Sequence, residues 1–143
     1  MLLLDTHVWI WTIDGDMRRV GRRARQALAR AEAADDIRVS IMTVFEVTAL
    51  HTLGRLRLSC PAEQWIRDGL AVAGVRLAEL TPTVAIDAGA IPRDTLADPI
   101  DRMLVATARQ LGATLLTCDE RILAYASHTR GVRVQNASEA SPR

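Results

Sequence analysis

Short apolar runs alternate along this chain with longer segments that have the composition and periodicity of amphipathic helices. The apolar runs cover residues 1–4, 37–40, 75–80, 114–117 and 132–134. The helical segments cover residues 7–13, 18–33, 43–53, 61–73, 81–91, 98–111 and 120–126. This alternation is typical of a parallel sheet with helices on both faces. We therefore predict an α/β protein whose ligand site lies at the carboxyl ends of the strands.

The length of the chain predicts one domain with a substantial core. We place this domain at residues 1–137 of the 143 and expect the small polar tail, residues 138–143, to be frayed. The apolar run that opens the chain is too short for a signal peptide or a membrane span. Cys60 and Cys118 have neither metal nor redox-pair spacing, which fits a reducing cytoplasm. We therefore expect a cytoplasmic protein without membrane association.

All 18 basic residues are arginines, and the chain has no lysine. This absence excludes mechanisms that need a lysine, such as a Walker-type phosphate loop or a Schiff base. The formal net charge of +1 does not by itself predict a polyanionic partner. Six arginines nevertheless gather in one stretch, namely Arg18, Arg19, Arg22, Arg23, Arg25 and Arg30. A solvated helix face and a patch that contacts phosphates both remain open.

Acidic residues follow two of the expected strands and precede one expected helix. Asp5 comes directly after the first apolar run, and Asp119 comes two residues after the fourth. Either residue would serve as the N-cap of the helix that follows it. Asp98 precedes Pro99, and since proline favours the first helical position, capping explains Asp98 without any chemistry. Capping and a chemical role both remain open for Asp5 and Asp119.

Two further acids, Glu46 and Asp101, lie on the apolar faces of predicted helices, because residues three, four and seven positions apart share a face. The apolar residues on these faces are Leu104, Val105, Ala108 and Leu111 for Asp101, and Ala49, Leu50 and Leu53 for Glu46. We expect the helix at 43–53 to be buried almost all round, since its other flanks are apolar too. A buried carboxylate is costly unless it pairs with an arginine or binds a cation.

Two acids at strand ends and two on inward helix faces can converge on one cleft. At about 4 Å and an effective dielectric near 20, each pair would repel by roughly 4 kcal/mol, and a cation would relieve this repulsion. Oxygen ligands favour Mg²⁺ or Mn²⁺ over Zn²⁺. The sequence thus predicts metal-dependent phosphate chemistry at Asp5, Glu46, Asp101 and Asp119. The three histidines share no metal spacing, although His7 is near enough to Asp5 to approach the cleft.

Four motifs occur along the chain in a characteristic order. They are residues 3–9 (LLDTHVW), residues 40–46 (SIMTVFE, continued by LGRL at 53–56), residues 97–108 (ADPIDRMLVATA) and residues 116–119 (LTCD). They resemble the opening, the Ser…Glu segment, the Asp-Pro-x-Asp-Arg signature and the Thr-x-Asp motif of PIN domains. The likeness is to VapC toxins of bacterial toxin–antitoxin pairs in particular, and it covers nearly the whole chain.

This resemblance implies a three-layer α/β/α sandwich with a mostly parallel central sheet. It implies a Mg²⁺- or Mn²⁺-dependent endoribonuclease that cleaves cellular RNA and inhibits translation, and that a VapB-type antitoxin neutralises. Homodimers and toxin–antitoxin hetero-oligomers are implied as well. The catalytic and metal-binding acids of the family fall, by position, on Asp5, Glu46, Asp101 and Asp119.

Four more residues of the motifs receive supporting roles from the resemblance. Thr6 and Thr117 would position water or a phosphate, Asp98 would cap its helix or act as an outer acid, and Arg102 would pair with an acid or face a phosphate. Leu50, Leu96 and Ile100 stand where many relatives carry a lysine, a histidine and an aromatic residue. None of these departures removes a metal ligand, but they leave open how RNA and antitoxin are gripped.

Two other functions fit the same residues. A PIN-like module that binds RNA or a partner without cutting would keep the fold, although it would not need the full set of acids. A nuclease that acts on structured DNA would use a related site, although the chain looks short for the extra helices that grip DNA. The sequence does not identify the RNA, the number of metal ions or the oligomeric state.

Overall fold

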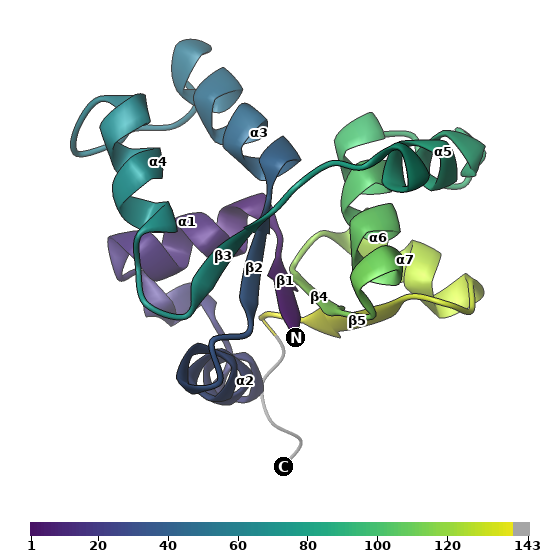
Figure 1. Ribbon diagram of the computed structural model, residues 1–143, viewed down its shortest axis with the longest axis horizontal. Helices are drawn as coiled ribbons and strands as arrows, with labels where there is room; N and C mark the ends of the chain where they lie inside the picture. Colours follow the sequence, from purple (N-terminus) through teal and green to yellow (C-terminus); the bar gives the residue numbers. More distant parts are fainter. Residues whose placement is uncertain (139–143) are drawn as a thin grey trace.

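The computed structural model describes residues 1–138, which form a five-stranded sheet with helices around it. The strands are β1 (Leu2–Leu4), β2 (Ile37–Ser40), β3 (Val75–Ala78), β4 (Thr114–Thr117) and β5 (Arg133–Asn136). They lie in the order β3-β2-β1-β4-β5, and all neighbouring pairs are parallel (Figure 1). The predicted parallel sheet is confirmed. The strand order reverses between β1 and β4, which is where sheets of this kind bind ligands.

Helices cover both faces of this sheet, as expected. They are α1 (Thr6–Asp14), α2 (Arg22–Ala33), α3 (Ile41–Thr52), α4 (Ala62–Leu70), α5 (Pro82–Ala90), α6 (Pro99–Leu111), α7 (Glu120–His128) and the short 3₁₀ helix η1 (Met17–Arg19). Successive strand residues point to opposite faces. Leu4 therefore packs with α1, α2 and α4, whereas Leu3 packs with α6 and α7. These two groups of helices lie on opposite sides of the sheet (Figure 1). The result is the three-layer α/β/α sandwich that the resemblance implies.

The clearest predicted helix, at residues 98–111, is confirmed as α6. The Asp98 carboxylate caps it by accepting hydrogen bonds from the backbone N–H groups of Ile100 (2.8 Å) and Asp101 (3.4 Å). Pro99 stands in its first turn, and Gly112 ends it with a positive φ of 62°, which a side chain would disfavour. The residues on the predicted inward face are buried up to Ala108, but Leu111 is 37% exposed and lies outside the core.

The continuous helix predicted at residues 18–33 is wrong, because the chain divides it into η1 and α2. Gly21 stands between them in an extended conformation, with φ −69° and ψ 165°. Its N–H donates to the carbonyl of Ala137 (2.7 Å), beyond the end of β5, and is therefore not available to a helix. The break ties the start of α2 to the carboxyl edge of the sheet.

The expectation that the helix at 43–53 is buried almost all round is also wrong. Along α3 only Thr43 and Val47 are buried, while Phe45 is 60% exposed. Leu53, which was expected to share a buried face with Glu46, is 68% exposed. The apolar residues of α3 that face away from β1 and α1 thus remain at the surface of the chain.

The remaining boundaries differ by a few residues. The strand expected at 75–80 ends at Ala78, and the last strand covers residues 133–136 in place of 132–134. Within residues 1–138, no helix combines the length and apolar character needed to cross a bilayer. Apart from Ser138, the tail expected to be frayed lies outside the described residues.

Candidate active site

A cavity of about 330 Å³ opens at the carboxyl ends of β1 and β4. We call it the acid cavity, because five of the eight residues that line it are acids. The lining residues are Asp5, Glu46, Asp98, Asp101, Asp119, His7, Trp11 and Cys118. The acids come from the end of β1, from α3, from the start of α6 and from the start of α7. The structure thus brings together the four acids predicted to converge, and it adds Asp98 to them.

Asp5 and Asp119 lie beside each other because β1 and β4 are neighbouring parallel strands. The Asp5 carboxylate accepts hydrogen bonds from the Thr6 N–H (2.7 Å) and from the Thr117 hydroxyl. The Thr117 oxygen in turn accepts a bond from the Asp119 N–H (2.9 Å). Asp119 caps α7 by accepting from the N–H groups of Arg121 (2.8 Å) and Ile122 (3.3 Å). Asp5 and Asp119 therefore serve as helix caps and as walls of the cavity at once.

Asp101 has the most perturbed environment of the five acids. It is 8% exposed, and within residues 1–138 no ion pair or side-chain hydrogen bond is made to its carboxylate. Burial is the main cause that raises the pKa of Asp101 to about 7. The negative charges of Asp98, Asp119, Asp5 and Glu46 raise this pKa further, in that order. The other four carboxylates of the cavity thus act electrostatically on Asp101.

Burial also raises the pKa values of Asp5 and Glu46. Hydrogen bonds from Thr117 and Thr6 partly offset the effect of burial on the pKa of Asp5. The Thr6 hydroxyl and His7 lower the pKa of Glu46 and so partly offset the effect of its burial. The sequence places no lysine near these acids, and within residues 1–138 no arginine forms an ion pair with Asp5, Glu46 or Asp101.

The donor chemistry of the acid cavity fits a hard divalent cation. Its charged groups are carboxylates, and the Thr6 hydroxyl is buried without a well-formed hydrogen bond to any described residue. As the side chains stand, no three His, Cys, Asp or Glu groups within residues 1–138 are close enough to ligate one ion. Asp98 and Asp119 direct oxygens toward helix N-termini, and Asp5 directs one toward Thr117. Binding an ion would therefore require these side chains to rotate.

Arg102 contacts a backbone carbonyl, whereas the resemblance implies a contact with an acid or a phosphate. Its Nη2 donates to the Ala97 carbonyl (3.5 Å), and its Nε is buried without a hydrogen-bond partner. It forms no ion pair within the part of the chain that the structure describes. Trp11 and Cys118 are lining residues that sequence reasoning missed. The spacing of His7 and Trp11, four residues apart on α1, was the signal for Trp11, since it places both rings on one helix face.

The comparison with known families agrees with this site. The sequence pattern described as "PIN domain" matches residues 2–127. The chain belongs to the PIN-domain family. Ribonuclease VapC22 of Mycobacterium tuberculosis is 35% identical to it over 133 residues, which cover 93% of this chain and 97% of that relative. The resemblance stated from the motifs is thereby confirmed.

Solved structures with a similar fold include a VapBC complex and a toxin–antitoxin complex. DNA-bound VapBC of Salmonella typhimurium superposes with a TM-score of 0.64 at 20% identity and covers 94% of this chain and 96% of that chain. A toxin–antitoxin complex from Klebsiella pneumoniae superposes with a TM-score of 0.61 at 19% identity, covering 97% and 99%. At these identities the structures establish the fold alone.

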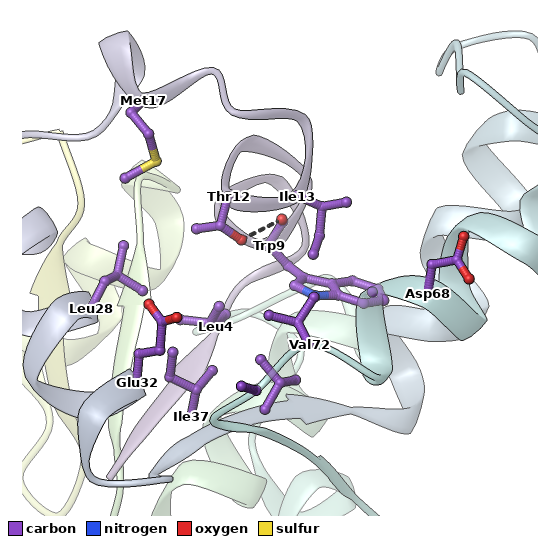
Figure 2. A pocket seen from close by; sticks show the side chains of 13 residues that line it. Leu4, Trp9, Thr12, Ile13, Met17, Leu28, Glu32, Ile37, Asp68 and Val72 are labelled. Carbon is purple, nitrogen blue, oxygen red and sulfur yellow. Dashed lines mark hydrogen bonds between the residues drawn. The ribbon is translucent and has the colours of Figure 1, made fainter.

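This PIN domain has a second cavity, which is apolar and about 440 Å³ in volume. We call it the apolar cavity. It lies between α1, α2 and α4, and Figure 2 shows Trp9, Ile13, Leu28 and Val72 around it. Two acids, Glu32 and Asp68, also line it. Trp9 is 1% exposed, and its Nε1 has no hydrogen-bond partner within the described residues. Gly69 makes room for this indole, because a Cβ there would lie 2.9 Å from Cζ2 of Trp9.

Proposed function

We propose that this PIN domain is a divalent-metal-dependent endoribonuclease that acts as the toxin of a toxin–antitoxin pair. The observation that carries the proposal is Asp101, a buried carboxyl without a counter-charge, whose pKa four neighbouring acids help to raise to about 7. Grouping five acids in one cavity is unfavourable for a folded chain unless a cation shares the site. The likeness to Ribonuclease VapC22 supports RNA as the substrate, which would be cleaved in the cytoplasm.

In the proposed site, Mg²⁺ or Mn²⁺ would be held by Asp5, Glu46, Asp101 and Asp119. A bound cation of this kind supplies Lewis-acid activation of water and neutralises charge on the phosphate. Thr6 and Thr117 orient the attacking water or the phosphate, and Asp98 fixes the start of α6 so that Asp101 faces the cavity. Arg102, which lies next to Asp101 in α6, would have to turn its guanidinium outward to reach a phosphate, because its Nε is buried. Water then attacks the phosphodiester and leaves a 5′-phosphate and a 3′-hydroxyl.

The proposal is tested by incubating the purified chain with total cellular RNA in EDTA, Mg²⁺ or Mn²⁺. We expect cleavage only with a metal, and we expect Asp101→Asn to lower the rate by roughly 100-fold or more. Even outer-shell partners of metal ligands are worth about 10- to 100-fold. The exposed Asp94 offers a matched control, because Asp94→Asn changes the same charge away from the cavity.

An Asp101→Asn protein as active as wild type would contradict the assignment of the site. Binding of Mn²⁺ without any turnover of RNA, by a folded chain, would favour the alternative of a catalytically silent binding module. Competition between RNA and structured DNA in the same assay separates the ribonuclease from a DNA nuclease.

A VapB-type antitoxin is the partner that this function requires, and it would neutralise the toxin by occluding the acid cavity. We propose that an apolar segment of the antitoxin anchors in the apolar cavity. That cavity presents apolar side chains at the surface, and two acids that would pair with a basic residue of the segment. A homodimer of the toxin and a toxin–antitoxin hetero-oligomer complete the proposed assembly.

A further inference from the structure

An aromatic ring lines the acid cavity, and an arginine lies over that ring. Trp11 lines the cavity together with His7, and the centroids of the two rings are 6.3 Å apart with their planes at 50°. The guanidinium carbon of Arg19 lies 5.7 Å from the Trp11 ring centroid, and the Arg19 side chain is 65% exposed. We infer that Trp11 and Arg19 form a stacking site for one unpaired nucleotide beside the phosphate that is cleaved. The inference deepens the proposed function and rests on it.

Local backbone contacts hold Arg19 at this place. The Trp11 carbonyl accepts a hydrogen bond from the Asp16 N–H (3.0 Å), which turns the chain back at the end of α1 and brings η1 toward Trp11. The Asp16 carboxylate then pairs with Arg18 (3.2 Å) and Arg19 (3.4 Å). Arg19 is therefore directed by its neighbours and does not reach the ring by chance.

Further arginines continue from this point along the edge of the sheet. The Gly21 N–H donates to the Ala137 carbonyl (2.7 Å), and the Ala137 N–H donates to the Thr117 carbonyl (2.8 Å). This chain of bonds places the start of α2, with Arg22 and Arg23, next to the carboxyl end of β4 that supports the acid cavity. Neither arginine forms an ion pair within residues 1–138, and both are exposed. A basic strip of Arg18, Arg19, Arg22 and Arg23 thus begins at the mouth of the cavity.

The chemistry of this surface matches a single strand of RNA. A nucleobase stacks on an indole whatever its identity, and arginines bind the phosphates on either side of it. The phosphate that is cut lies over the acids, and the next phosphates follow the basic strip. The neighbouring base inserts between the Trp11 indole and the exposed Arg19 guanidinium, which moves outward to admit it. A base inside a duplex has no free face to offer. The substrate is therefore an unpaired strand or loop.

A simpler reading is that Trp11 only fills space, since it packs partly against the core. Packing alone does not account for an indole in the wall of an acid-lined cavity with an exposed guanidinium on it. An acidic peptide of a protein partner would use the arginines, but it would gain little from the indole. The stacking site, a packing role for Trp11 and a surface for an acidic peptide make different predictions for the binding of RNA that lacks one base.

The test measures binding of the chain to a short fluorescent single-stranded RNA in EDTA, by anisotropy. Parallel RNAs carry an abasic ribose at each position in turn. We expect Trp11→Ala to weaken binding roughly 5- to 150-fold and Trp11→Phe to retain most of the affinity. For one abasic RNA, Trp11→Ala should have no further effect. Arg19→Ala should lower the salt slope of log K by about 0.7, and the exposed Arg67→Ala on α4 should leave affinity and slope unchanged.

Several outcomes would overturn the inference. They are full affinity in Trp11→Ala, equal loss on every abasic RNA, equal binding of duplex RNA, and no binding of RNA by the wild-type chain. Weaker antitoxin binding with unchanged RNA binding would assign the surface to the partner instead. Failure of the proposed function can be told apart from failure of the stacking site. If Asp101→Asn stays active while Trp11→Ala still has no further effect on one abasic RNA, only the acid site is contradicted. Conversely, if cleavage depends on metal but Trp11→Ala weakens binding of every abasic RNA equally, only the stacking site is contradicted.

Discussion

The two cavities of this PIN domain are built on different faces of one nine-residue helix. Residues of α1 that face the acid cavity are His7 and Trp11, whereas Trp9, Thr12 and Ile13 face the apolar cavity (Figure 2). The acid cavity groups like charges that the fold leaves without counter-charges. The apolar cavity groups side chains that already contribute to the core. The helix α1 thus contributes to an acid cavity that destabilises the fold and to an apolar cavity whose side chains stabilise it.

The difference teaches where to look for function in a fold of this kind. Sites of chemistry are the places where a chain departs from what is best for stability, and the raised pKa of Asp101 is such a departure. In the apolar cavity, such a departure is the unpaired Nε1 of Trp9, which has no partner within residues 1–138. We therefore expect variants of the two cavities to separate catalysis from partner binding and stability.

The largest expected effect concerns the apolar cavity. Val72 is 43% exposed at its rim, and an arginine there would fill the cavity and pair with Asp68 or Glu32. We expect Val72→Arg to weaken binding of the proposed antitoxin by roughly 100-fold, because it displaces the proposed apolar anchor. Cleavage of RNA by the free chain should not change. Titration calorimetry and the cleavage assay measure the two effects.

Val72→Ala offers a matched control that shortens the same side chain without filling the cavity. Loss of cleavage in a folded Val72→Arg protein would show that the two cavities are not independent. Unchanged antitoxin affinity would remove the apolar cavity as the anchor.

The second effect is a pH dependence that belongs to the acid cavity alone. The folded chain raises the pKa of Asp101 from its ordinary value of 3.8 to about 7, so between these values the folded state binds more protons than the unfolded state. The free energy of unfolding therefore falls as the pH rises through this window and levels off above it. Asp5 and Glu46, whose pKa values are also raised, contribute with the same sign.

Without metal we expect the chain to be more stable at pH 5 than at pH 8, by roughly 1–3 kcal/mol. This is less than the full shift would give, because the carboxyl reaches solvent through the cavity. Asp101→Asn should remove most of the difference, Asp94→Asn should keep it, and Mg²⁺ should raise the stability at pH 8. Urea unfolding at both pH values measures this. A difference that Asp101→Asn leaves intact would contradict the account of Asp101.

The alternation of apolar runs and amphipathic segments predicted the sheet and the helices α1 to α7, but it joined η1 and α2 into one helix. Local chemistry was decisive where it was strong, as at Asp98, Pro99 and Gly112, which bound α6 at both ends. Prediction failed where a distant contact decides. Gly21 interrupts a segment of good helix formers because its N–H is bound to Ala137, more than a hundred residues away. The exposure of Phe45 likewise depends on how far α3 projects from the sheet, which periodicity does not report.

The acids of the site could be located from sequence because burying a carboxylate without a partner is costly, whatever the fold. Their roles as ligands stay predictions. Trp11 could not be recognised in this way, since a tryptophan at helical spacing is usual in any core. Its place in the cavity follows from the direction in which α1 leaves the end of β1, beside β4, and this direction is a three-dimensional fact.

The smallest expected change in stability comes from Thr6, at the boundary between the two faces of α1. Its hydroxyl is buried and has no well-formed hydrogen bond to any described residue, while its N–H binds Asp5. Thr6→Val keeps the shape of the side chain and removes a buried hydroxyl that makes no well-formed hydrogen bond, so the free energy of unfolding should change by less than about 1 kcal/mol. Cleavage should fall by roughly 10-fold or more, because the proposed positioning of water or phosphate is lost. Thr6→Ser, which restores the hydroxyl, should recover most of the activity. Urea unfolding measures the stability of these variants, and the RNA assay measures their activity.

A loss of stability of several kcal/mol in Thr6→Val would reveal a hydrogen-bond partner for the hydroxyl. Full activity in Thr6→Val would show that Thr6 is a packing residue, which contributes to stability as Trp9 does and not to catalysis.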